Sequence, residues 1–260
     1  QSWCRCGRGE PSPGADVAGA LRRCASPPSP QDGRVCLPRA PLALRWQLGQ
    51  YRTYLHYIAK LAAAVGFAVD EDEAGFPAGT RTLLLIGPKE PGFWAHVQAQ
   101  PEWSGPHPLD RWSRRVIGRV ACDLGAKALF PFGGPPYQPF YSWALRTGRV
   151  WDSPVKLLVH ATQGLMVSFR GALALPRALT LPAPAVQPCE ACAKPCLTAC
   201  PASALTGAGY DVPRCRAHLD QPDGADCLSG GCLVRSPCPA GAGYARMPYQ
   251  SAYHMRQFHP

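Results

Sequence analysis

The sequence has 260 residues, 13 of them cysteine, and a formal net charge of +10 at pH 7. A chain of this length can bury a hydrophobic core without disulfide bonds, so the cysteines are not needed as a scaffold. Its basic residues are scattered rather than gathered in a patch, which argues against nucleic acid as a partner. No apolar run reaches the roughly 18 residues of a membrane-spanning helix, so we expect no transmembrane segment.

Residues 1–43 are predicted to form an N-terminal extension, because they are rich in proline, serine and glycine and show no periodicity. Arginines with few acidic residues favour an organellar targeting region, mitochondrial or plastid, with the cytoplasm as the alternative location. Cys4, Cys6, Cys24 and Cys36 lie here, and no pair has the Cys-x2-Cys spacing typical of zinc sites. Thiols or a local disulfide are favoured over a metal, and the role of these four cysteines stays open.

Residues 44–182 are predicted to form an α/β layer domain in which helices alternate with strands. Apolar residues from Trp46 to Val65 recur mostly at three- and four-residue steps, which predicts a helix that ends near Gly66. The continuous apolar run at 81–88, closed by Gly-Pro, predicts a buried strand.

The second half of this domain begins with a predicted helix at 109–125. Its buried stripe consists of Trp112, Val116, Val120 and Leu124, and its arginines, Arg111, Arg114, Arg115 and Arg119, are expected to form a solvated face. A strand that enters a rigid turn is predicted at 127–134, and two β-rich runs at 155–160 and 165–175 suggest a hairpin or neighbouring strands. Residues 176–188 are a proline-rich connector.

Residues 183–260 contain eight of the cysteines and end in a predicted amphipathic helix at 248–259. The run "CEACAKPCLTACPAS" has the spacing Cys-x2-Cys-x3-Cys-x3-Cys-Pro, and a second, looser run also ends in Cys-Pro. Two-cluster ferredoxins use a similar pattern, in which each Cys-Pro cysteine binds the cluster of the other run. This logic assigns Cys189, Cys192, Cys196 and Cys238 to cluster 1, and Cys200, Cys215, Cys227 and Cys232 to cluster 2.

Two [4Fe–4S] clusters are therefore the predicted cofactors, four cysteines to each. Two structural zinc sites are the alternative, since they would also use eight cysteines. A disulfide framework is the least favoured interpretation, because the chain does not need one to fold.

These motifs resemble the epoxyqueuosine reductase family, which is related to reductive dehalogenases and to the cobalamin-processing protein of animals. The resemblance rests on the α/β domain, on "LLVHATQGLMVSFRGALALPRALTLP" and on the eight-cysteine segment, and covers roughly residues 76–260. The "FGGPPY", "RGAL" and "CRAHL" motifs are most similar to small bacterial ferredoxin-like proteins. The resemblance to this family implies a nitroreductase-like domain followed by a two-cluster ferredoxin-like domain. The Asp-Tyr-His triplet and the C-terminal helical repeats of the reductases are absent from the sequence, which argues against epoxyqueuosine reduction itself.

The resemblance also singles out Asp110 as a candidate proton donor, near the start of a basic helix. The alternative is that Asp110 only complements the helix dipole from the first turn. The loop "FPFGGPPYQPF" at 130–140 is a second candidate, because Gly133 and Gly134 allow close approach of a cofactor and the prolines make the loop rigid. Gly133, Gly134 and Tyr137 are its candidate cofactor-binding residues, and a rigid corner without a ligand is the alternative.

Three functions follow from these observations. The first is an iron–sulfur protein that transfers electrons, or whose clusters stabilise one subunit of a larger redox assembly, with a protein as its redox partner. The second is a cobalamin- or flavin-dependent reductase fed by its own clusters, although neither cofactor is expected. The third is a zinc-stabilised binding module. A non-catalytic role is favoured over an enzymatic one, because no convincing catalytic constellation is found in the sequence.

Overall fold

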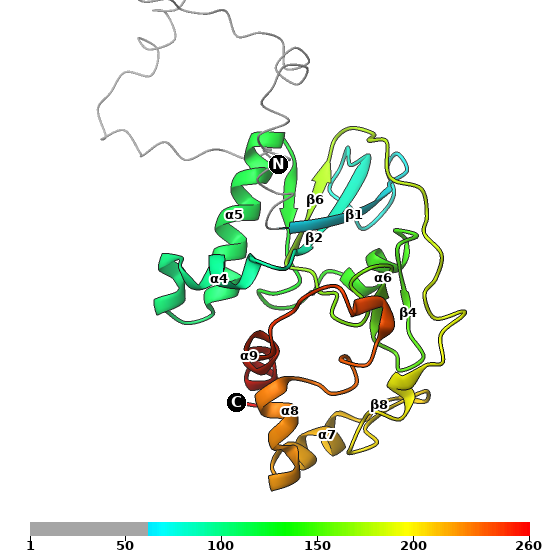
Figure 1. The fold of residues 1–260 in the computed structure, drawn as a ribbon. Helices are drawn as coiled ribbons and strands as arrows, with labels where there is room; N and C mark the ends of the chain where they lie inside the picture. The colour runs from blue at the N-terminus through cyan, green and yellow to red at the C-terminus, as the bar shows by residue number, and fades with distance from the viewer. Residues whose placement is uncertain (1–61) are drawn as a thin grey trace, which may run out of the picture. The chain divides into compact units, whose positions relative to one another are not determined.

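The computed structural model describes residues 62–260, which contain a four-stranded antiparallel sheet (Figure 1). Its strands, in the order β1-β2-β6-β3, are β1 Ala62–Ala68, β2 Thr82–Pro88, β6 Gly171–Leu175 and β3 Lys127–Leu129. All three strand pairs are antiparallel, which agrees with the α+β form of the predicted α/β (α+β) fold class. The strands predicted at 81–88 and 127–134 are confirmed.

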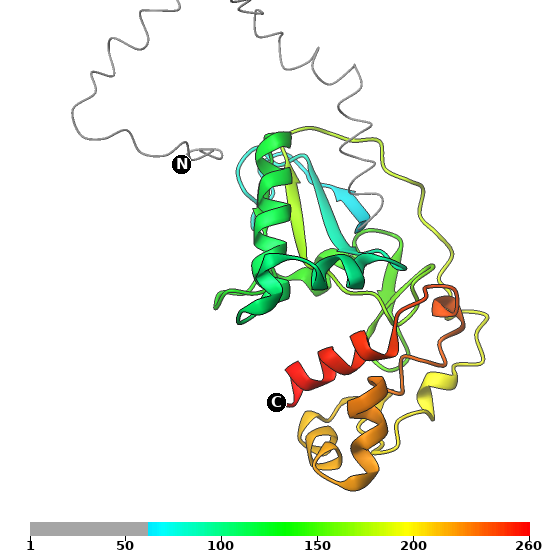
Figure 2. The same cartoon turned by 60° about the vertical axis from the view of Figure 1, so that its left-hand side comes forward.

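Both faces of the sheet are covered, which explains why β2 and β6 are almost continuously apolar. On one face, Leu83 and Leu85 pack with α6 (Phe140–Leu145) in the largest apolar cluster. Helix α5 (Pro108–Leu124) contacts β6 and β3 (Figure 2), and Ile117 of α5 lies against Gly171 on the other face. A Cβ added to Gly171 would lie 2.8 Å from Cδ1 of Ile117, so glycine permits this close packing.

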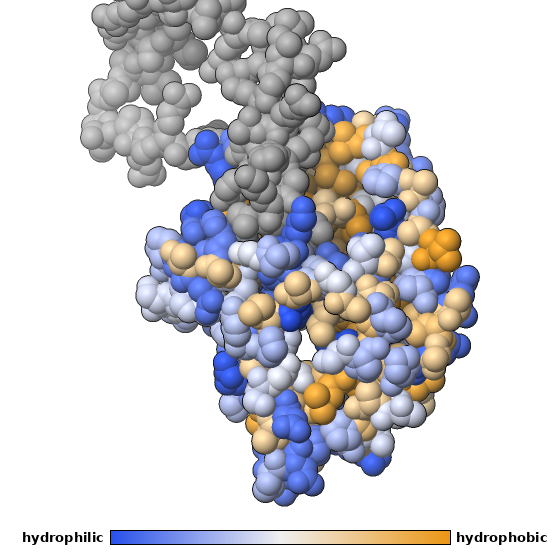
Figure 3. All heavy atoms as spheres, viewed as in Figure 1, coloured by the Kyte–Doolittle hydropathy of each residue, from blue (hydrophilic) through white to orange (hydrophobic). Residues whose placement is uncertain are grey.

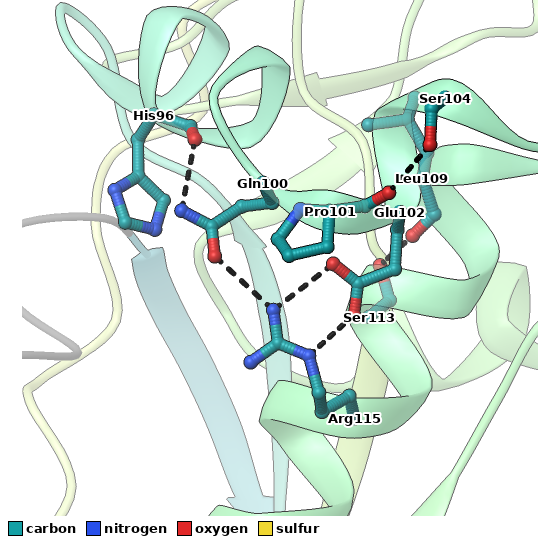
Figure 4. Close-up of polar contacts among 8 residues, drawn as sticks. All are labelled: His96, Gln100, Pro101, Glu102, Ser104, Leu109, Ser113 and Arg115. Carbon is teal, nitrogen blue, oxygen red and sulfur yellow. Dashed lines mark hydrogen bonds and ion pairs between the residues drawn. The ribbon is translucent and has the colours of Figure 1, made fainter.

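Helix α5 confirms the helix predicted at 109–125, and its buried side chains include Trp112 and Val120. Val116 and Leu124 are only half-buried. The predicted arginine face is exposed, yet Arg115 is held there by Glu102 and Gln100 of the preceding segment (Figure 4). That segment consists of α4 (Phe93–Gln98) and η1 (Pro101–Ser104), neither of which is predicted from the sequence.

The helix predicted to end near Gly66 is wrong over residues 62–66, where the chain forms β1. Val65, Phe67 and Val69 are buried and Ala64, Ala68 and Asp70 are exposed, with buried Gly66 as the exception, which follows the two-residue period of a strand. Pairing with all of β2 overrides the helical preference of the alanines in "AAAVGFA". The rest of that helix, at 44–61, and the extension with Cys4, Cys6, Cys24 and Cys36 lie outside the described residues.

The two runs at 155–160 and 165–175 do not form a hairpin with each other. β5 (Leu158–His160) pairs with β4 (Val150–Asp152), whereas β6 is a central strand of the main sheet. Between them the chain turns at Gly164, which forms an isolated bridge with His160. The expectation of neighbouring strands is therefore wrong, because each run has its own partner elsewhere.

The cysteine-rich segment has short elements. They are η2 Pro195–Leu197, β7 Leu205–Thr206, β8 Gly209–Tyr210, α7 Val212–Leu219, η3 Pro222–Gly224, α8 Ala225–Gly230, η4 Pro239–Gly241 and α9 Pro248–Phe258. Helix α9 confirms the predicted C-terminal helix and packs against α8. It also contacts the part of the chain before the cysteine-rich segment, residues 62–182, which we call the sheet region. The ring centroids of Tyr253 in α9 and Trp94 in α4 are 5.2 Å apart.

The sheet region and the cysteine-rich segment belong to one compact unit. The buried hydroxyl of Tyr244 donates to the carbonyl of Pro88 at 2.7 Å, which ties the chain before α9 to the end of β2. The predicted domain boundary near residue 182 stays a prediction. None of the helices in residues 62–260 is long and apolar enough to cross a membrane.

Candidate metal centres in the cysteine-rich segment

Cys189, Cys192, Cys196 and Cys238 line one cavity of about 260 Å³ of space between atoms, part of it open to solvent. The first two lie in the irregular chain before η2, Cys196 is in η2, and Cys238 directly precedes η4. The rest of the wall is largely apolar and includes Val159 and Leu165 of the sheet region. Four thiols from two distant stretches of sequence therefore share one enclosure.

The electrostatics of this group agree with its geometry. Burial raises the pKa of the Cys189 thiol above its ordinary value, and the next largest influence is the thiol of Cys238. Cys192 and Cys196 raise the same pKa further. Cys238 therefore interacts with the three cysteines of the first run rather than only with its own sequence neighbours.

Cys200, Cys215, Cys227 and Cys232 line a second cavity of about 330 Å³, measured in the same way. Cys215 is in α7, whose first turn is fixed because the Asp211 side chain accepts a hydrogen bond from the Arg214 backbone N–H at 3.0 Å. Cys227 is buried in α8, Cys232 follows that helix, and Cys200 comes from the first run. Leu205, Leu219 and Val234 supply apolar wall.

This second group is also linked electrostatically. Burial raises the pKa of the Cys227 thiol, and the thiols of Cys232, Cys215 and Cys200 raise it further, against an opposing backbone N–H from Leu233. Burial likewise raises the pKa of Cys232. Cys200 thus acts within the second group, although its sequence neighbours belong to the first.

Backbone amides point at two of the sulfurs. The N–H of Lys194 donates to Sγ of Cys192 at 3.3 Å, and the N–H of Ala204 donates to Sγ of Cys200 at 3.2 Å. Lys194 has a left-handed backbone with φ of 57°, which turns the chain back toward Cys192. Such donors favour the thiolate that a metal requires.

An apolar cluster lies between the two cavities. Val155, Val159, Leu165, Leu205 and Val234 form it, with both cysteine groups packed against it. Val159 and Leu165 line the first cavity, whereas Leu205 and Val234 line the second. The two groups of thiols therefore share this cluster as an apolar partition, which joins the sheet region to the cysteine-rich segment.

Gly164 is a contact that the sequence analysis missed, since "ATQG" reads only as a turn. Its φ is +54°, and a Cβ added there would lie 2.8 Å from Sγ of Cys238 and 2.5 Å from the backbone nitrogen of Gly241. Only glycine allows the chain to pass this close to Cys238. In the sequence this residue is only a glycine that follows a predicted strand, and such a glycine does not indicate which distant residue it contacts.

Of the other predicted site residues, Asp110 and Gly133 lie at α5. Asp110 is in the first turn of that helix and forms an ion pair with Arg170, whose Nε also donates to Ser113 Oγ at 3.2 Å. Gly133 lies against Arg114, because a Cβ there would be 2.4 Å from Nη2 of that arginine.

The arginines link Asp110 to the loop at 130–140. Arg114 and Arg170 both lie over the Phe132 ring, each at 5.1 Å from its centroid. Gly134 has φ of 104° and open space around its Cα, and the Tyr137 side chain is 65% exposed. Asp110 and Gly133 thus share one neighbourhood, from which no described contact reaches Tyr137. The roles of these residues in cofactor binding or catalysis stay predictions.

Among residues 62–260, no three histidine, cysteine or acidic side chains converge closely enough to hold a single metal ion. None of the eight cysteines between 189 and 238 is in a disulfide. The eight thiols therefore line two cavities and do not converge on the positions of two single metal ions.

Neither a family model nor a curated protein matches this chain. Among solved structures, the chain is similar to selenomethionine-labelled epoxyqueuosine reductase, with 14% sequence identity and a TM-score of 0.45. The match covers 78% of this chain and 68% of that one. It is a distant structural resemblance to a member of the same family that the cysteine-rich motifs resemble, and it does not assign this chain to that family.

Proposed function

We propose that this protein carries two [4Fe–4S] clusters and acts in electron transfer, or as the cluster-stabilised subunit of a larger redox assembly. The observation that carries the proposal is the division of eight thiols into two groups of four. Each group contains three cysteines of one run and the Cys-Pro cysteine of the other, Cys238 or Cys200. Two-cluster ferredoxins exchange their ligands in this way.

The spacing of the thiols favours cubes over zinc. A tetrahedral zinc ion with Zn–S bonds of about 2.3 Å requires its sulfurs to lie within about 4 Å of one another. The described side chains do not converge in this way, and each group lines a cavity instead. A cube of four irons and four sulfides is wider than one ion and needs ligands arranged around a space.

The surrounding residues suit this role. When bound, a cluster would supply one-electron transfer. The chain would hold each cluster by four thiolates, exclude water with the apolar partition around Val159 and Val234, and donate backbone N–H groups to sulfur. These three features set the reduction potential of such centres. A protein redox partner, in an organelle or in the cytoplasm, completes the proposal.

The first test is the metal content of protein purified without oxygen. We expect about eight irons and eight sulfides per chain, with a paramagnetic signal after reduction by dithionite. Zinc without sulfide would refute the proposal in favour of a structural module. Cobalamin or flavin retained in stoichiometric amounts, together with iron, would favour the reductase alternative.

Paired substitutions test which cysteines belong together. Cys192→Ala with Cys238→Ala removes two ligands of one group, so iron is expected to fall from about eight to about four per chain. Cys192→Ala with Cys200→Ala removes one ligand from each group, so both clusters are weakened and iron is expected to fall well below four. The reverse ranking of the two double variants would show that the ligands are not exchanged between the runs.

A further inference from the structure

A third cavity lies beside the second cysteine group; its space between atoms, measured as for the two thiol cavities, is about 960 Å³, of which about 290 Å³ is wide enough for solvent to enter. Cys215 and Cys232 form part of its wall, and α9 contributes Ser251, His254 and Phe258. Figure 3 shows an opening in this face of the molecule, in the region that α8, α9 and the chain between them surround in Figure 1. The volume of about 290 Å³ that solvent can enter is close to the lower limit of small-molecule pockets, which is roughly 300 Å³.

Two arginines, Arg235 and Arg246, line this cavity, and neither forms an ion pair with an acidic side chain within residues 62–260. Arg235 donates from Nη1 to the carbonyl of Leu165, and Arg246 donates from Nη1 to the carbonyl of Met166 at 3.2 Å. Among residues 62–260, no ion pair includes either arginine, and no aspartate or glutamate lines the cavity. The two cations therefore share an enclosure that no carboxylate of residues 62–260 lines.

Arg246 is the more informative of the two. Its Nε is buried and has no hydrogen-bond partner. Burial, and then the charge of Arg235, lower the pKa of Arg246 to about 10, and the opposing influences of Tyr244 and Glu90 are smaller. A buried donor on an unpaired cation is costly unless something accepts from it.

The cysteine thiolates do not account for both arginines. The backbone N–H of Arg235 donates to the carbonyl of Cys232 at 3.1 Å, so Arg235 lies next to the second thiol group, which can balance part of its charge. No cysteine is among the groups that act on Arg246. Glu90 acts on Arg246 but does not line the cavity, and no ion pair joins the two among residues 62–260, so the cavity leaves space for an anion that contacts Arg246 directly.

The remaining walls indicate what else the ligand carries. Apolar side chains line the cavity together with hydroxyl groups, and the apolar ones include Leu157, Val167 and Phe258. Burial lowers the pKa of His254 to about 3, and the nearby arginines lower it too, so its imidazole is neutral at pH 7. A neutral ring beside two guanidinium groups can hydrogen-bond a ligand without adding charge.

We propose that this cavity binds a small molecule with an oxyanion head, a phosphate or a carboxylate, on an apolar body. The head lies between Arg235 and Arg246, and the body lies against the apolar wall. Guanidinium groups bind both oxyanions through charge-assisted hydrogen bonds. The inference that a ligand binds depends only on the cavity. A redox role for that ligand, which would lie against Cys215 and Cys232, rests on the proposed function.

Calorimetric titration of the full-length, metal-loaded protein tests this proposal, with phenyl phosphate, benzoate and the neutral benzyl alcohol as probes. We expect one anion to bind saturably at one site per chain, and benzyl alcohol to bind at least about tenfold more weakly. Binding of phenyl phosphate alone identifies the phosphate class, and binding of benzoate alone the carboxylate class. Saturation by neither anion below about 10 mM, or equal binding of benzyl alcohol, overturns the proposal.

Substitution of Arg246 locates the site. Arg246→Gln is expected to weaken anion binding at least about tenfold, and Arg246→Lys to weaken it less, because the charge is kept. Arg119→Gln is the matched control, since it removes an exposed arginine of α5 far in sequence from the cavity. Unchanged anion binding by Arg246→Gln overturns the proposal. If that variant does not fold, the affinity for the anion relative to benzyl alcohol is compared between Arg246→Lys and Arg119→Gln, and equal values overturn the proposal. Iron measured on each sample tests the clusters separately.

Discussion

The sheet region and the cysteine-rich segment differ in what fills their interiors. In the sheet, Leu83, Leu85 and Leu173 are at most 1% exposed and pack in continuous layers. Among the largest fully buried side chains of the described residues, only Val234 and Gln250 come from residues 183–260. The strands β7 and β8 have two residues each. Apolar burial can stabilise the first region, whereas the second needs another source of stability, which the proposed clusters would supply.

Removal of the metal would test this contrast most strongly. Ligation contributes on the order of 10 kcal/mol in small metal-stabilised domains, more than the net stability of many domains. Stripping iron with a chelator is therefore expected to abolish hydrogen-exchange protection in α7 and α8 while β2 and β6 keep theirs. Mass spectrometry of exchanged peptides measures both regions in one sample. Equal protection before and after removal would show that the segment folds without metal.

A core substitution in the sheet should have the opposite distribution of effects. Leu173→Ala leaves a cavity in a central strand that is paired on both sides, so the free energy of unfolding is expected to fall by about 2–5 kcal/mol. Iron per chain should not change, because Leu173 does not line either thiol cavity. Chemical denaturation and metal analysis check the two parts.

Leu145→Ala is the control for this experiment, since Leu145 is 39% exposed in α6. It is expected to cost less than about 1 kcal/mol. If the Leu173 variant lost iron in proportion to its stability, the two regions would have to be treated as one energetic unit.

The same contrast explains which parts of the fold were predictable. β2 was recognisable because "TLLLIGP" is apolar on both faces, and α5 because apolar residues from Trp112 to Leu124 recur at four-residue steps. These signals are local. β1 was not recognisable, because its identity depends on pairing with β2, and an alanine-rich stretch that continues a helical pattern carries no trace of that partner.

The candidate site divides in the same way. The spacing of the cysteines predicted two groups that exchange Cys-Pro ligands, because such a pattern is a constraint within one stretch of chain. Gly164 and Cys238 are distant in sequence, and so are the two parts of the chain, around Leu157 and around Arg246, that line the third cavity. A single sequence does not specify such contacts, since any glycine turn or arginine has many possible partners.

A pH-dependent effect is expected in the sheet region, close to the partition. Burial, and then the charge of Arg149, lower the pKa of His160 to about 4, below its value near 6.5 in the unfolded chain. The unfolded state therefore takes up a proton first, and stability is lost as the pH falls from about 6.5 toward 4. Between pH 6.5 and 5 the loss is expected to be roughly 1–2 kcal/mol, which denaturation at several pH values measures.

His160→Asn is the matched variant for this prediction. Nδ1 of His160 accepts hydrogen bonds from the backbone N–H groups of Thr162 and Gln163 at 3.1 and 3.2 Å, and an asparagine oxygen can accept from both. The variant should unfold with a weaker dependence on pH over this range. An unchanged dependence would place the proton uptake elsewhere.

The smallest effects are expected from surface charges, which would sharpen the contrast by showing how little they add to the sheet region. Arg115 is half-exposed and contacts Glu102 and Gln100, so it connects α5 to η1. Arg119 pairs with Asp123 within α5 and is 73% exposed. Arg115→Ala is expected to cost roughly 1 kcal/mol, because it leaves a mostly buried carboxylate without its partner, and Arg119→Ala less than about 0.5 kcal/mol. Thermal unfolding of both variants ranks them, and a larger cost for Arg119→Ala would contradict the view that only charges joining separate elements matter here.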